Sequence, residues 1–198
     1  YTVGPTLPQV LGDAAPKGNN ADLRTSGWEF SASWNNSFKV AGRDFHYNVK
    51  AMLWDSRSFV TKYYNANGNI STYAAAVTTH YYKGMQIGEI WGFTSEGLFK
   101  DEQDVASHAD QSFFNHSSNR LPLPGALKFK DINGDGKVDR GNQTLSDHGD
   151  LKIIGNSSPR YQFGVNLGFS WDQIDVGAFF QGVGKEDWYP SAEAGLFW

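Results

Sequence analysis

Cysteine is absent from the 198 residues of this chain, which excludes disulfide scaffolds, thiolate zinc sites, iron–sulfur clusters and cysteine nucleophiles. A strong excess of either sign of charge is missing as well. The chain has 17 Lys and Arg and 21 Asp and Glu, which gives a net charge of -4. Nucleic acids are bound through a basic field, so we expect no nucleic-acid partner. Long hydrophobic runs are also missing, since no stretch approaches the ~18 consecutive apolar residues of a membrane-spanning helix. The sequence therefore excludes a helical membrane protein.

Aromatic residues are abundant, with 14 Phe, 9 Tyr and 7 Trp in a chain of mean hydropathy -0.50. This composition is typical of a β-rich protein rather than a helix bundle. The chain starts at Tyr1 without an initiator Met and stops at an apolar run ending in Trp198. We expect it to be part of a longer polypeptide.

Four segments alternate apolar and polar residues with a period of two, which predicts strands whose two faces meet different surroundings. At roughly 9 to 12 residues, these strands suit tilted crossings of a bilayer. Aromatic residues gather at their ends, as in the interfacial girdles of outer-membrane barrels. A soluble β-sandwich also alternates, but its core favours Val, Ile and Leu, and its outer face carries more Lys and Glu. The four segments are residues 28–34, 45–53, 161–171 and 174–181.

Short connections join these strands in pairs, through residues 35–43 and through a tight hairpin at Asp172 and Gln173. In outer-membrane barrels short turns face the periplasm, so we expect an extracellular excursion between the pairs. The predicted organisation is barrel strands with a preceding loop in residues 1–54, an extracellular region in 55–158, and a barrel hairpin with a following loop in 159–198. Within the excursion, residues 83–93 are strand-like. Four strands cannot close a barrel, which needs about 8, so we expect the others elsewhere.

An Asp-rich loop at residues 131–142 has the residue spacing of a calcium-binding loop. Oxygen ligands fall at positions 1, 3, 5, 7, 9 and 12, and Gly136 stands at the sharp turn of position 6. The usual bidentate Glu of position 12 is replaced by an Asn, so we expect weak calcium binding that stiffens the loop. Two Asn-Gly and Asp-Gly turns without metal are the alternative. The predicted ligands are Asp131, Asn133, Asp135, the carbonyl of Lys137, Asp139 and Asn142.

Motifs in a fixed order cover most of residues 5 to 189. They read GWE at 27–29, GMQIGEIWGF at 84–93, EGLF at 96–99, FKDINGDGKVD at 129–139, IIGNSSPRY at 153–161 and FFQGVG at 179–184. This series resembles the C-terminal part of the SusC/RagA-type TonB-dependent outer-membrane transporters of Bacteroidetes. The stretch 140–150 departs from the family pattern like an insertion, and Asn142 stands where an acidic residue is frequent.

The resemblance implies a fragment of a 22-stranded transmembrane β-barrel with an N-terminal plug, in the outer membrane of a Gram-negative bacterium. It implies import of glycan or peptide fragments rather than enzymatic activity. Energy would come from the TonB complex acting on the plug, and a SusD-like surface lipoprotein would cap the barrel. Outer-membrane lipid would surround it.

Two other functions compete with the transporter. The Asp-rich loop and the aromatic residues fit a soluble, calcium-dependent carbohydrate-binding β-module. A glycoside hydrolase would need two converging carboxylates, whereas Glu96, Asp101, Glu102 and Asp104 read as solvated loop acids. The histidines, at positions 46, 80, 108, 116 and 148, are scattered without metal spacing. The aromatic residues of the excursion either stack on sugars, contact a lid protein or pack within the loop; they are Tyr63, Tyr64, Tyr73, Tyr81, Tyr82, Phe113 and Phe114.

Overall fold

The computed structural model describes residues 2–3, 18–19, 21–71, 80–114 and 122–189. The chain divides into two compact units. The first, here called the sheet unit, comprises Arg24–Ser58 and Ser157–Asp187. The second, here called the loop unit, comprises Tyr1–Leu23, Phe59–Asn156 and Trp188–Trp198. The predicted division at residues 54 and 158 concerns position relative to a membrane and stays a prediction.

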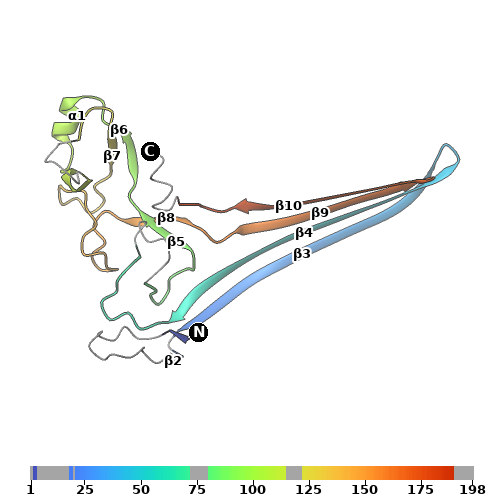
Figure 1. The fold of residues 1–198 in the computed structure, drawn as a ribbon, viewed down its shortest axis with the longest axis horizontal. Helices are drawn as coiled ribbons and strands as arrows, with labels where there is room; N and C mark the ends of the chain where they lie inside the picture. Colours follow the sequence, from blue (N-terminus) through green and yellow to red (C-terminus); the bar gives the residue numbers. More distant parts are fainter. Residues whose placement is uncertain (1, 4–17, 20, 72–79, 115–121, 190–198) are drawn as a thin grey trace, which may run out of the picture. The chain divides into compact units, whose positions relative to one another are not determined.

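The sheet unit is built on one four-stranded sheet in the order β10-β9-β4-β3. The strands are β3 (Asp22–Val40), β4 (Arg43–Lys62), β9 (Arg160–Trp171) and β10 (Ile174–Lys185), and they lie side by side in Figure 1. Both β4 and β10 run antiparallel to β9. Helical structure in the described residues is confined to α1 (Glu102–Ser107) and η2 (Ser112–Phe114). The predicted all-β, antiparallel fold is therefore confirmed.

The pairing register separates the apolar and polar residues of this sheet onto opposite faces. Leu167 of β9 stands between Val49 of β4 and Ala178 of β10, and the next residue, Asn166, stands between Lys50 and Phe179. Because successive side chains of a strand point to opposite faces, this register brings most of the apolar residues to one side, with Met52 and Phe179 as exceptions on the other. The sheet consequently has an apolar face and a polar face, as the alternation predicts.

The strand ends differ from the prediction in one hairpin. The nine-residue connection predicted at residues 35–43 is wrong, because β3 and β4 continue to a two-residue turn at Ala41 (φ 51°) and Gly42 (φ 78°). Two positive φ values are what a type I′ hairpin turn requires. The Phe38 and Phe45 rings pack across this hairpin with centroids 5.1 Å apart. The second hairpin turns at Asp172 and Gln173, which confirms that prediction.

The described part of the loop unit contains short two-stranded sheets. Its described residues contain three antiparallel strand pairs. These are β1 (Thr2–Val3) with β2 (Gly18–Asn19), β5 (Glu89–Gly92) with β8 (Lys152–Asn156), and β6 (Ser95–Leu98) with β7 (Leu127–Phe129). Its buried cluster contains Ile70, Trp91 and Leu151.

The strand predicted over residues 83–93 is shorter in the structure. Glu89–Gly92 forms the paired strand, and Gln86 makes a single antiparallel bridge to Phe59. Gly84 and Gly88 have φ values of 93° and 89°, which lie outside the β region and turn the chain before the strand begins. In the described residues, no helix is long and apolar enough to span a membrane.

Candidate functional site

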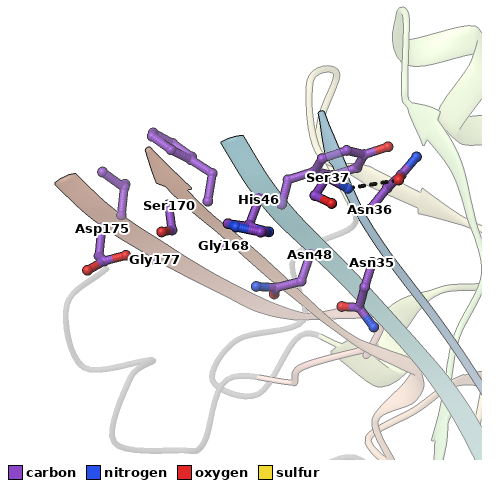
Figure 2. A pocket seen from close by; sticks show the side chains of 12 residues that line it. Asn35, Asn36, Ser37, His46, Asn48, Gly168, Ser170, Asp175 and Gly177 are labelled. Atoms are coloured by element: carbon purple, nitrogen blue, oxygen red, sulfur yellow. Dashed lines mark hydrogen bonds between the residues drawn. The ribbon is translucent and has the colours of Figure 1, made fainter. Parts of the chain in front are cut away.

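The polar face of the sheet unit carries an open depression, whose lining side chains are drawn in Figure 2. The register places His46 of β4, Ser170 of β9 and Asp175 of β10 in one row across three strands. The neighbouring row contains Asn48. Ser37 of β3 also lines the depression. Long alternating strands thus bring amide, hydroxyl, imidazole and carboxylate groups from four strands onto one surface.

Glycines on this surface have no side chain, which leaves space for a neighbouring side chain to lie over them. A Cβ atom on Gly168 would come within 2.5 Å of the Asn48 Nδ2 atom, so the Asn48 amide lies over that glycine. A Cβ on Gly177, in the same row, would meet nothing within 4 Å. Amide, hydroxyl and imidazole groups hydrogen-bond neutral polar groups such as sugar hydroxyls or peptide amides. The surface is therefore suited to a polar solute rather than to an apolar one.

The Asp-rich loop is held by its own carboxylates. The two Asp131 oxygens accept hydrogen bonds from the backbone N–H groups of Gly134 and Gly136 at 2.6 and 3.0 Å. Both glycines have positive φ, 76° and 84°, which lets the chain turn tightly beneath the carboxylate. Asp135 accepts a hydrogen bond from the Lys137 N–H at 2.8 Å, and Asp139 accepts one from the Gly141 N–H at 2.7 Å. The predicted ligand residues therefore form a chain of side-chain-capped turns.

Asp150 closes this loop, and the sequence analysis did not identify it. Its side chain is fully buried. One oxygen accepts from the Ile132 N–H at 2.6 Å and the Asn133 N–H at 3.3 Å, and the other accepts from the Asp139 N–H at 2.9 Å. A single carboxylate thereby joins the start and the end of the Asp-rich segment. No sequence signal distinguishes Asp150 from the other Asp residues of this region.

Asn142, predicted at position 12 of a calcium loop, is engaged elsewhere. Its Nδ2 donates a hydrogen bond to an Asp147 carboxylate oxygen at 2.5 Å. Across the described residues, no three His, Asp or Glu side chains converge in a way that would hold a metal. The predicted set also draws on an Asn oxygen and a backbone carbonyl, so the calcium site stays a prediction.

Two residues of the predicted acidic run, Asp101 and Asp104, make contacts that hold helix α1. Asp101 caps the helix by accepting from the Asp104 N–H at 2.8 Å. Asp104 pairs with the Lys128 ammonium at 2.7 Å and also accepts from the Lys100 N–H. The Lys128 hydrogen bond, followed by that of Lys100, holds the pKa of Asp104 below its usual value. These contacts are structural, and they give no sign of a paired acid and base.

The histidines occupy separate surroundings. His108 bonds through Nε2 to the Phe129 carbonyl oxygen at 2.8 Å, and the His148 ring packs 5.6 Å from the Trp91 ring. His46 lines the polar depression. His116 lies outside the described residues.

The aromatic residues of the excursion divide into packed and exposed groups. Phe113 and Phe114 pack against Phe93, with ring centroids 6.5 and 4.8 Å away. Tyr82 donates a hydrogen bond to the Glu89 carboxylate, and burial, together with that acid, raises its pKa. The Tyr63 and Tyr81 rings make an edge contact at 5.6 Å, whereas Tyr64 is 83% exposed. Tyr73 lies outside the described residues.

Comparison with known proteins finds a distant similarity. No protein-family model matches the chain. Over 189 residues, 91% of this chain, it is 23% identical to TonB-dependent receptor P3 of Formosa agariphila. The chain spans 17% of the length of that relative. The similarity points to TonB-dependent receptors as a class and does not distinguish the SusC/RagA type within it.

Proposed function

We propose that this chain forms part of the wall of a TonB-dependent transporter in the outer membrane. The observation that carries the proposal is the exposed apolar face of the sheet unit. Large side chains stand uncovered on it, including Phe30, Trp34 and Phe180 at 59%, 62% and 57% exposure. Water disfavours such a surface, whereas acyl chains solvate it. The similarity to a TonB-dependent receptor gives independent support.

The strand lengths support a membrane crossing. Strands β9 and β10 each contain 12 residues, close to the 9–11 that a tilted strand needs to cross a bilayer. Strands β3 and β4 contain 19 and 20 residues and exceed that need. In this arrangement the polar face lines the lumen, and the depression around His46 contacts the passing solute.

At a finer level, we infer a SusC/RagA-type transporter. Its barrel would have 22 strands and a plug, energy would come from the TonB complex, and a SusD-like surface lipoprotein would cover it. The cargo would be a glycan or peptide fragment, and the chain would have no enzymatic role. The ordered motifs from residue 27 to residue 184 support this inference. So does the polar, nearly neutral lining of the proposed lumen.

Membrane fractionation of the native host tests the proposal. We expect the protein in the outer-membrane fraction, soluble only with detergent, and migrating faster in SDS before boiling than after it, as folded barrels do. Recovery in the soluble fraction without detergent would contradict the transporter. It would favour a calcium-dependent carbohydrate-binding module, for which the exposed apolar face is unfavourable.

We also propose calcium as a structural ligand of the Asp-rich loop. Support comes from oxygen-bearing side chains at alternate positions of one tight loop, namely Asp131, Asn133, Asp135 and Asp139. The carboxylates now accept backbone N–H bonds, so binding would require them to share those contacts, and we expect weak affinity. Titration with terbium, read by its luminescence, should show saturable binding displaced by calcium. Asp135→Asn should weaken that binding, and the control Glu96→Gln, at an exposed acid outside the loop, should not; equal binding by both variants would contradict the assignment.

A further inference from the structure

Asp55 and Arg160 form a buried, two-fold hydrogen-bonded ion pair in the sheet unit. Asp55 lies on β4 and Arg160 opens β9, 105 residues later in the chain. The guanidinium Nε donates to Oδ1 and the Nη2 donates to Oδ2, both at 2.5 Å. The side chains are only 6% and 13% exposed. The sequence analysis singled out neither residue as functional.

The backbone around this pair is shaped to fit it. Gly27 of β3 approaches so closely that a Cβ there would lie 2.7 Å from the Asp55 carbonyl oxygen. Tyr161 has a φ of 54°, rare for an aromatic residue, and its N–H points to Asp55 Oδ1 at 3.4 Å. A Cβ on Gly184 would lie 3.1 Å from the Tyr161 Cβ. Two of the motif segments, at 27–29 and 153–161, therefore meet at Asp55.

The position of the pair in the chain gives it a particular role. The chain passes from the sheet unit to the loop unit at Phe59 and returns to the sheet unit at Ser157, shortly before Arg160. No short turn therefore sets how β4 aligns with β9, in contrast to the two hairpins. Hydrophobic alternation excludes a slip of one residue, which would exchange the faces, but it permits a slip of two. Such a slip would move Arg160 away from Asp55 and leave a buried charge unpaired.

We propose that the Asp55–Arg160 pair is a register latch that aligns β4 with β9 across the long excursion. The polar rows are aligned in this register, in which His46 faces Ser170 and Asn48 faces Gly168. A slip of two residues would separate both pairs. The pair thereby positions the polar depression without touching a solute.

The same sheet provides a matched control. Arg43 and Asp172 also form an Arg–Asp ion pair, at the turn end of the sheet, with side chains 57% and 38% exposed. An exposed pair contributes little, because water and salt screen it. Beside it, the two-residue turns already fix the chain. Loss of this control pair should leave the register unchanged.

Cysteine crosslinking measures the register directly, because this chain has no cysteine of its own. Val49→Cys with Leu167→Cys reports the native pairing. Val49→Cys with Val165→Cys, or with Phe169→Cys, reports a slip of two residues. The protein is produced in its native host and oxidised in whichever fraction contains the wild type. The measurement therefore reports on the latch even where the proposed transport function fails.

The decisive background is the double variant Asp55→Leu with Arg160→Met. It leaves no unpaired buried charge, so the sheet can still fold while the latch is lost. We expect the native crosslink to fall at least about three-fold and the slipped crosslinks to appear; a three-fold fall corresponds to about 0.7 kcal/mol, at 1.4 kcal/mol for each factor of ten. Arg160→Lys keeps the charge but loses the two-fold hydrogen bonding, so it should shift crosslinking in the same direction. This variant replaces the double variant in the test if the double variant does not accumulate. Asp172→Asn should give the wild-type pattern. If the latch variants gave native crosslinks and no slipped ones, the proposal would be overturned.

Discussion

Arginine substitutions at adjacent positions of β9 separate the two faces of the sheet. Val165 lies on the apolar face between Ala51 and Phe180, whereas Asn166 lies on the polar face between Lys50 and Phe179. An arginine on the lipid face near the bilayer midplane costs about 2–4 kcal/mol. On the polar face, the charge opposite Lys50 costs about 0.2–1 kcal/mol. The burial of charge in lipid is therefore the larger effect.

Folded and unfolded protein are distinguished in outer-membrane extracts by their migration in SDS before boiling. We expect Val165→Arg to reduce the folded fraction strongly and Asn166→Arg to leave most of it, with a difference of roughly 2 kcal/mol in a urea titration. Val165→Leu, which keeps the face apolar, is the control for side-chain size. Equal losses for the two arginine variants, or a larger loss at Asn166, would refute the assignment of the faces.

Three further predictions concern named groups. Asp150→Asn should destabilise the Asp-rich loop by about 1–3 kcal/mol, because an amide nitrogen cannot accept a backbone N–H; faster amide exchange at Asp139, absent in the exposed variant Asp147→Asn, would show it. Gly27→Ala should cost about 1–3 kcal/mol through overpacking, whereas Gly177→Ala, which meets nothing within 4 Å, should be neutral in the same melt. The pKa values of Asp104 and Asp110 are lowered by Lys128 and by the Ser112 N–H respectively. Their stabilisation is therefore complete at neutral pH and is lost as pH falls from about 4 through the lowered pKa values; proteolysis at α1 that is equally slow at pH 7 and about pH 2 would contradict this.

The faces of the sheet were predictable from the sequence because alternation is a local property. The alternation from Tyr161 to Trp171 shows which residues share a face, although it leaves open a slip of two residues between neighbouring strands. The strand ends were harder, because Asn36 interrupts the apolar series and resembles the start of a loop. The turn lies at Ala41 and Gly42, where positive φ, rather than polarity, decides the geometry.

The contacts between distant residues were not predictable from the sequence. Asp150 lies among several Asp residues, and only the folded loop shows that it is the buried one. Asp55 follows an alternating segment and resembles the start of a loop, yet it pairs with Arg160 at the opposite end of the excursion. Sequence spacing identifies residues that are close along the chain, whereas these partners are brought together by sheet pairing and chain return.

Spin labelling of β9 tests the central claim, that lipid covers the apolar face of the sheet. Because the chain has no cysteine, nitroxides can be placed singly through Val165→Cys, Leu167→Cys and Asn166→Cys in the membrane-extracted protein. The account predicts that labels at 165 and 167 collide frequently with oxygen, which concentrates in lipid, and rarely with a water-soluble nickel chelate, while the label at 166 shows the reverse. Labels at 165 and 167 shielded from both reagents would place that face inside a protein core and contradict the account.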